Sequence, residues 1–230
     1  SREGMFRCAA DVAGAVGQEK PQTVRPLAER SVKNIHPVRK NPGDVPVGEK
    51  ADVLRMAAEA ARAESDKIVQ ATGNYLDNDR SVLIANSEGL FVTDRKVRTR
   101  LALFAIASEG GENQSGFYGP GGGVGFELFE TVDPRAVGRR AAKQALINLS
   151  AGYCPAGTMA VAIENGFGGV IFHEACGHSL EATSVGVGSS QMCGKLGKQI
   201  ANPKVTAIDD GTIPGAWGSY NVDDEGNPAT

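Results

Sequence analysis

Apolar and polar positions recur along this chain with two different periods, which separate helical from extended stretches. Residues 4–20 and, more clearly, residues 49–68 carry apolar side chains at helical spacing. The stripe of the second stretch consists of Leu54, Ala58, Ala61, Ser65 and Ile68. Between the two stretches, residues 21–48 hold five of the eleven prolines. Because proline fixes φ and lacks an N–H donor, we expect an extended connector there.

Short apolar runs replace the helical spacing over residues 69–132. The runs 82–84 and 90–92 flank a glycine-containing turn and predict a hairpin. A third apolar strand, 101–106, ends at Gly110. Because the turns between these strands are short, they favour an antiparallel meander.

The C-terminal part of the chain returns to a helical pattern. An aspartate–proline pair, an N-cap followed by proline in the first turn, predicts a helix over 133–150. A short strand is predicted over 158–163, a second helix over 170–182 and one more strand over 204–208. The whole pattern predicts an α+β fold: an antiparallel β meander with flanking helices, and the 170–182 helix near the C-terminal end.

Composition narrows the classes of protein that fit this pattern. With 230 residues, 41% of them hydrophobic, the chain is long enough for one large domain or two small ones. A net charge of −3 without a dense Lys/Arg stretch argues against nucleic acid as a partner. No apolar run approaches the roughly 20 residues that cross a bilayer, so no membrane association is expected. The four cysteines lack CxxC spacing, which favours a reducing, cytoplasmic setting.

Candidate chemistry is concentrated in one segment, His173-Glu174-Ala175-Cys176-Gly177-His178. Catalytic zinc binds imidazole nitrogens and lowers the pKa of its water to about 7. We therefore expect His173 and His178 to be metal ligands. Glu174 is expected to act as a general base, taking a proton from the zinc-bound water and delivering it to the leaving amine.

The spacing of the two histidines makes a geometric prediction. In the common zincin signature HExxH the histidines are four residues apart, whereas here they are five apart, HExxxH. At about 3.6 residues per turn, five residues leave the two side chains about 140° apart around a regular α-helix. The helix is therefore predicted to bulge or wind locally as a π-helix near Cys176 and Gly177, where glycine accepts an unusual backbone shape.

Other interpretations of these residues remain open. The two histidines could be structural, without a metal. Glu181, three residues after His178, could share its helical face and complete a metal site. Cys154, Cys176 and Cys193 are expected to be small buried residues rather than ligands.

The wider context resembles the TldD/PmbA family of zinc metallopeptidases. The similarity lies in residues 168–182 around the HExxxH motif and extends over roughly 45–230. It includes the segments 85–89, 125–127, 194–197, 208–212 and 223–226. The resemblance implies a cytoplasmic zinc peptidase that hydrolyses unfolded or flexible peptides, with His173 and His178 as zinc ligands and Glu174 as the base. It also implies a homodimer, or a heterodimer with a PmbA-like (TldE) subunit that lacks the motif.

The same resemblance bears on completeness. Family members are about twice as long, and their third zinc ligand is a cysteine in a C-terminal half, which would lie outside this chain. The chain is therefore expected to be a fragment in three parts. Residues 1–48 are a helix and connector of an incomplete N-terminal domain, 49–165 its α+β core, and 166–230 the metal-motif helix and the start of a C-terminal domain. Two alternatives are a non-catalytic assembly subunit and a peptide-binding module with structural histidines.

Four further features receive simple expectations. The glycine-rich segment 119–125 lacks a phosphate-loop ending and is expected to be a flexible loop. His36 is expected to be solvated, and Trp217 and Tyr220 either line a binding edge or pack. A set of acidic residues is expected to form turns, with a role near the metal as the alternative. This set comprises Asp209, Asp210, Asp223, Asp224 and Glu225.

Overall fold

The computed structural model describes residues 1–16 and 25–230, which form two compact units. Unit 1 consists of Ser1–Ala151 together with Asp210–Thr230, and unit 2 is Gly152–Asp209. Unit 1 holds all the strands assigned among the described residues, so it corresponds to the predicted β meander with helices. Unit 2 holds the metal-motif helix.

Helices form near both predicted positions in the N-terminal half. Helix α1 spans Arg2–Val16, and residues 17–20 of its predicted range lie outside the described residues. Helix α2 spans Val47–Arg62 and ends earlier than predicted. The Ser65 hydroxyl accepts the Lys67 N–H at 3.2 Å and holds a turn that closes the helical pattern.

The apolar stripe of α2 is therefore only partly the predicted one. Ala61 is buried as expected, and Leu54 and Ala58 are partly buried. Ser65 and Ile68 lie beyond the helix, and Ile68 instead begins the first long strand.

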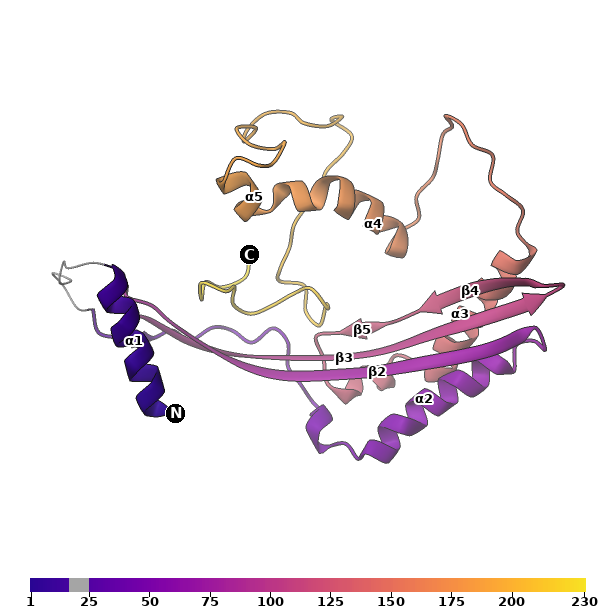
Figure 1. The fold of residues 1–230 in the computed structure, drawn as a ribbon, viewed down its shortest axis with the longest axis horizontal. Helices are drawn as coiled ribbons and strands as arrows, with labels where there is room; N and C mark the ends of the chain where they lie inside the picture. The colour runs from indigo at the N-terminus through magenta and orange to yellow at the C-terminus, as the bar shows by residue number, and fades with distance from the viewer. Residues whose placement is uncertain (17–24) are drawn as a thin grey trace. The chain divides into compact units, whose positions relative to one another are not determined.

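A long hairpin dominates unit 1, where the sequence predicted only short strands (Figure 1). Strand β2, Ile68–Ala85, pairs antiparallel with β3, Leu90–Glu109, and β3 continues into β4, Glu112–Tyr118. The antiparallel meander is thus confirmed. The strands were underestimated because a polar run at 77–81 interrupts the apolar pattern, yet the backbone pairs through it.

Turns close the meander where the sequence predicted them. In the first, the Asn86 side chain accepts the backbone N–H groups of Glu88 and Leu90, and Gly89 has a φ of 93°. In the second, Gly110 and Gly111 have φ values of 60° and 89°, which disfavour residues with a Cβ atom. Two short strands complete the sheet: β1, Ala28–Glu29, parallel to β3, and β5, Gly121–Gly122, antiparallel to it.

One face of the sheet packs on α2 and on α3, which spans Pro134–Ser150 (Figure 1). Helix α3 begins as predicted, because Asp133 accepts the N–H of Arg135 at 2.9 Å. A Cβ atom added at Gly138 would lie 1.9 Å from the Ala57 carbonyl oxygen of α2, so the two helices approach more closely than any side chain permits. The shared core is made of Val53, Ala57, Ala61, Ala71, Leu101, Leu103, Ala105, Ala107, Val137, Ala141, Ala142 and Ala145.

Residues 25–41 of the connector contain no helix, as predicted, but Pro42–Asp44 form a 3₁₀ helix and α2 already begins at Val47; residues 21–24 lie outside the described residues. The connector is fastened to unit 1. The buried Glu127 carboxylate accepts the backbone N–H groups of Arg39 and Lys40 at 3.0 and 2.9 Å. Burial alone would raise the pKa of Glu127, but these donors, with the N–H groups of Gly125 and Glu127 itself, hold that pKa below its ordinary value.

Two expectations about polar segments are wrong. His36 is buried rather than solvated, because its Nδ1 accepts the Gly215 N–H at 3.1 Å and so ties the connector to the C-terminal segment. The glycine-rich segment is not a free loop either. Gly121 and Gly122 pair with β3 as strand β5, and Gly122 and Gly123 are buried.

Unit 2 contains no strand among its described residues, so the strands predicted at 158–163 and 204–208 are wrong. A short apolar run becomes a strand only where a neighbouring strand satisfies its N–H and C=O groups, and neither run has such a neighbour in the described chain. None of the described side chains of unit 2 is buried. Among the residues described, no helix combines the length and the hydropathy required to span a membrane.

Candidate metal centre

The metal-motif helix predicted over 170–182 is a series of short helical turns. A 3₁₀ turn, η3 (Gly166–Gly168), leads into α4 (Gly169–Phe172), which continues as the π-helix η4 (His173–Gly177). A further 3₁₀ turn, η5 (His178–Leu180), follows, and α5 (Ala182–Gly186) begins after a break at Glu181. The irregularity predicted near Cys176 and Gly177 is therefore confirmed, and it is a π-turn.

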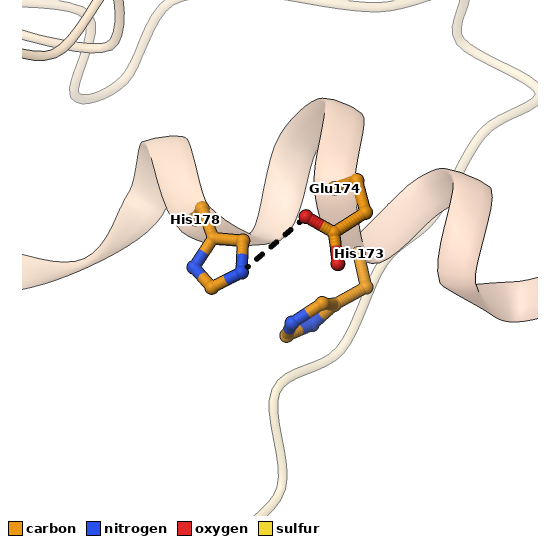
Figure 2. A group of neighbouring side chains, drawn as sticks. All are labelled: His173, Glu174 and His178. Atoms are coloured by element: carbon orange, nitrogen blue, oxygen red, sulfur yellow. Dashed lines mark ion pairs between the residues drawn. The ribbon is translucent and has the colours of Figure 1, made fainter.

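The π-turn brings the two histidines to one side of the helix. The N–H of His178 donates to the carbonyl of His173, five residues earlier, which is the bond that defines a π-turn. As a result the two imidazole rings lie 4.5 Å apart, centroid to centroid, at 65° to each other. Figure 2 shows the two rings and the Glu174 carboxylate turned toward one another.

Gly177 contributes to this arrangement by its size. Its φ of −57° is ordinary for any residue, so the conformational freedom expected of glycine is not the reason for its presence. A Cβ atom at this position would lie 3.2 Å from Nδ1 of His173, tighter than a normal van der Waals contact. The missing side chain leaves room for the His173 ring.

Two carboxylates contact the two ring nitrogens of His178. Glu181 Oε1 lies 2.6 Å from Nδ1, and Glu174 Oε2 lies 3.6 Å from Nε2. The hydrogen bond to Glu181, the charge of Glu181 and then the charge of Glu174 raise the pKa of His178 above its ordinary value. With Nδ1–H donating to Glu181, the neutral ring presents the lone pair of Nε2 toward His173 and Glu174.

This group has the composition of a metal site. One ligand atom each of His173, Glu174 and His178 lie within 4.8 Å of one another, and all three side chains are exposed. Two imidazoles and a carboxylate are ligands that zinc accepts. Glu181 is not part of this group among the described residues; it lies on the other nitrogen of His178, where it orients that ring rather than adding a donor to the set.

The remaining predicted residues lie elsewhere in the chain or have other contacts. Cys154 is exposed and Cys176 and Cys193 are partly exposed, so the expectation of buried cysteines is wrong; none belongs to the group among the described residues. Asp210 accepts the N–H and hydroxyl of Thr212, and Asp223 accepts the N–H groups of Glu225 and Asn227. These two carboxylates therefore form turns, as expected.

Sequence reasoning missed the role of Glu181 at His178. The signal was present, since a carboxylate three residues after a histidine lies on the same helical face, but the spacing alone does not say which ring nitrogen it meets.

Two imidazoles and a carboxylate on one helix form a donor set that a metal ion could occupy, and comparison with known families gives the class of protein: metallopeptidases. Residues 40–149 match the PmbA/TldA metallopeptidase central domain, and residues 156–230 match the PmbA/TldA metallopeptidase C-terminal domain. The chain belongs to the TldD/PmbA family.

Individual relatives agree with this assignment. The chain is similar to the metalloprotease TldD homolog of Haemophilus influenzae, with 38% identity over 185 residues, 78% of this chain and 38% of that protein. It is also similar to a metalloprotease of Methanothermobacter thermautotrophicus, with 40% identity over 80% of this chain and 40% of that protein. The chain thus spans about two fifths of the length of these relatives.

Solved structures share the fold. A crystal structure of a candidate DNA gyrase modulator from Thermotoga maritima aligns with a TM-score of 0.72 at 25% identity, covering 93% of this chain and 48% of that one. A second, from Bacteroides thetaiotaomicron, aligns with a TM-score of 0.76 at 18% identity, covering 100% of this chain and 53% of that one.

Proposed function

We propose that this chain carries the zinc-binding helix of a peptidase that hydrolyses peptide bonds in unfolded or flexible peptides. The observation that supports this most directly is the π-turn, because it converges His173, Glu174 and His178 although a regular α-helix would separate the two histidines.

His173 and His178 are the proposed zinc ligands, and the structure of the segment gives each a reason for its orientation. The ring of His173 occupies the space that Gly177 leaves open. The ring of His178 is held through Nδ1 by Glu181, which leaves Nε2 to bind the ion. Zinc in such a site acts as a Lewis acid that polarises the scissile carbonyl and makes water more acidic.

Glu174 is the proposed general base. Its carboxylate lies beside both imidazoles, where it can accept a proton from the attacking water. It then returns that proton to the amine nitrogen as the peptide bond breaks.

Family resemblance supports the rest of the proposal. The third ligand is a cysteine outside this chain. The active form is a homodimer, or a heterodimer with a PmbA-like (TldE) subunit, and it works in the cytoplasm. Apolar side chains on the surface of unit 2 are consistent with burial against further protein.

Metal content tests the proposal. The 230-residue chain and a version extended at its C-terminus are purified with zinc supplied, and zinc per chain is measured by elemental analysis. We expect about one zinc per extended chain, lost in His173→Ala. Glu174→Gln should keep the zinc and abolish hydrolysis of an unfolded peptide. Glu164→Gln, an exposed acid in the same unit and outside the group, is the matched control and should change neither.

Two results would contradict the proposal in different ways. Absence of zinc from both forms at neutral pH would favour structural histidines. If Glu174→Gln bound zinc and kept full activity, Glu174 would not be the general base, and the metal site would work by another mechanism.

A further inference from the structure

The face of the sheet that α2 and α3 do not cover carries a row of cations. In the middle of β3, Val97, Thr99 and Leu101 are buried, and the alternate residues Lys96, Arg98 and Arg100 face the other way. Arg80 of β2 is paired directly with Lys96 across the hairpin and lies on the same face. We call Arg80, Lys96, Arg98 and Arg100 the cationic row; all four belong to unit 1.

The cationic row has no acidic partner within the described chain. No carboxylate of the described residues lies within the 4.0 Å of an ion pair from Arg80, Lys96, Arg98 or Arg100. Arg95, one residue from the row on the opposite face, shows the contrast, because it holds Asp79 through two hydrogen bonds of 2.8 and 2.6 Å. Arg95 is thus paired with a carboxylate, and in the part of the chain that the structure describes the four cations of the row are not.

Aromatic rings hold the row in place. Trp217 has the Arg98 guanidinium 5.4 Å and the Arg100 guanidinium 5.9 Å from its ring centroid, and Tyr220 has the Lys96 ammonium at 5.6 Å. Arg100 also donates from Nε to the Gly119 carbonyl at 3.1 Å. Stacking of this kind limits the motion of a cation, and Lys96, Arg98 and Arg100 remain partly exposed beside the rings.

The row continues into exposed apolar surface. Beyond Arg100 on the same face, Phe104 and Phe117 lie 4.5 Å apart, ring centroid to centroid, and are 52% and 37% exposed. A ligand lying along β3 would therefore meet cations first and then two aromatic rings.

The period of the row is informative. Alternate residues of a strand are about 6.8 Å apart, since each residue advances the chain about 3.4 Å. An extended peptide presents the side chains of one face with the same repeat. Acidic residues at every second position of such a peptide would each oppose one cation of Lys96, Arg98 and Arg100.

We propose that the cationic row binds an extended peptide segment with acidic residues at alternate positions, followed by an apolar residue on the Phe104–Phe117 pair. The inference rests on the proposed function in one respect, namely that peptides are the substrates, and it adds a preference among them. A nucleic acid would also complement cations, but a chain of net charge −3 with ring faces already stacked by its own arginines offers little for bases.

Binding is measured on the 230-residue chain by the fluorescence of Trp217, its only tryptophan, and by calorimetry. Three peptides of equal length are compared: one with glutamate at alternate positions, one with the same glutamates in a block, and one with glutamine in their place. At about 20 mM salt we expect the alternating peptide to bind about tenfold more tightly than the glutamine peptide, because three ion pairs to partly exposed cations together supply that ratio. The block peptide should fall between, and the contrast should vanish at about 500 mM salt.

Variants separate the row from general charge attraction. Arg98→Gln and Lys96→Gln should each weaken the alternating peptide about threefold. Lys96→Gln leaves both contacts to Trp217 intact and so guards against a fluorescence artefact. Arg95→Gln, with the same change in net charge on the opposite face, is the matched control and should leave the affinity unchanged.

The outcomes are distinct from those for the zinc site, because this binding needs neither metal nor hydrolysis. Equal binding of all three peptides, or equal losses in Arg95→Gln and Arg98→Gln, would overturn the inference and leave the peptidase proposal standing. Tighter binding of a single-stranded oligonucleotide that displaces the peptide would assign the row to nucleic acid instead. Selective peptide binding, together with no zinc in either the 230-residue chain or its extended form, would preserve the inference and refute the zinc site.

Discussion

Unit 1 and unit 2 differ in how their residues are supported. In unit 1, two helices cover one sheet face and enclose residues such as Leu101 and Leu103 with no exposed surface. In unit 2, no described side chain is buried, although many are large and apolar. The exposed set includes Met159, Val161, Ile163, Ile171, Phe172, Val187, Leu196, Ile200, Val205 and Ile208.

The difference teaches that the candidate metal centre does not depend on a core for its geometry. The convergence of His173 and His178 arises within one π-turn, from backbone hydrogen bonding and the small size of Gly177. Unit 1 is organised by contacts between residues far apart in sequence, and the described contacts of the site are local. The following predictions test this contrast, beginning with the largest effect.

Amide hydrogen exchange should show the largest difference. Strand β3 amides open only with the collapse of the core, whereas turns of unit 2 have no buried contacts to lose. We expect protection factors in β3 to exceed those in α4 and η4 by at least about a thousandfold, or about 4 kcal/mol. Similar protection of the two units in this chain would break the comparison.

A pair of leucine substitutions tests the same contrast by stability. Leu103→Ala removes a fully buried side chain and should cost about 2–5 kcal/mol of unfolding free energy. Leu196→Ala alters a side chain that is 101% exposed and should change it by less than about 0.5 kcal/mol. Urea unfolding followed by circular dichroism gives both values, and comparable losses would show that Leu196 is buried in solution.

Glu127 tests whether the connector belongs energetically to unit 1. In Glu127→Gln, one carboxylate oxygen that accepts a backbone N–H is replaced by an NH₂ group, which cannot accept. We therefore expect the unfolding free energy to fall by about 1.5–3 kcal/mol at pH 7. Glu130→Gln, which breaks only an exposed ion pair with Arg39, should cost less than about 1 kcal/mol.

The pH dependence of that difference has a definite sign. Because the folded pKa of Glu127 lies below its unfolded value, its contribution is complete above the unfolded pKa and is lost as pH falls through the folded pKa. The difference in unfolding free energy between the parent chain and Glu127→Gln should therefore shrink as the pH is lowered from 7 toward about 3. A gap that widens on acidification would contradict the assignment.

The smallest effect concerns Glu181 and should be confined to the metal. Glu181→Ala frees the His178 ring, so zinc affinity measured by chelator competition should fall about 10–100-fold. Because Glu181 is 56% exposed, unfolding free energy without zinc should change by less than about 0.5 kcal/mol. Glu181→Gln, which keeps an acceptor for Nδ1–H, should recover part of the affinity; a uniform loss of stability instead would make Glu181 a structural residue.

Sequence patterns predicted those features that short-range physics controls. The N-cap at Asp133 and the glycine turns depend on a few adjacent residues, and the structure has them where expected. The π-turn was predicted from the five-residue spacing of His173 and His178, because only a widened turn lets side chains at that spacing reach one metal ion.

What the sequence did not predict depends on distant partners. The full length of β2 and β3 comes from pairing through the polar run at 77–81, which no local propensity favours. His36 is buried because the segment at Gly215 returns to it from 179 residues away. The apolar runs at 158–163 and 204–208 were wrongly predicted as strands. Their composition is strand-like, but no described strand lies beside them to pair with.

The π-turn also bears on how such sites arise. A π-turn holds one residue more than an α-turn, so removal of a single residue between His173 and His178 would give the four-residue spacing of the common zincin signature on a regular helix. In terms of descent, one in-frame codon separates the two signatures, and the two histidines would face the same side of the helix in both. Relatedness among zinc peptidases is therefore better judged from the surrounding fold than from the number of residues between the histidines.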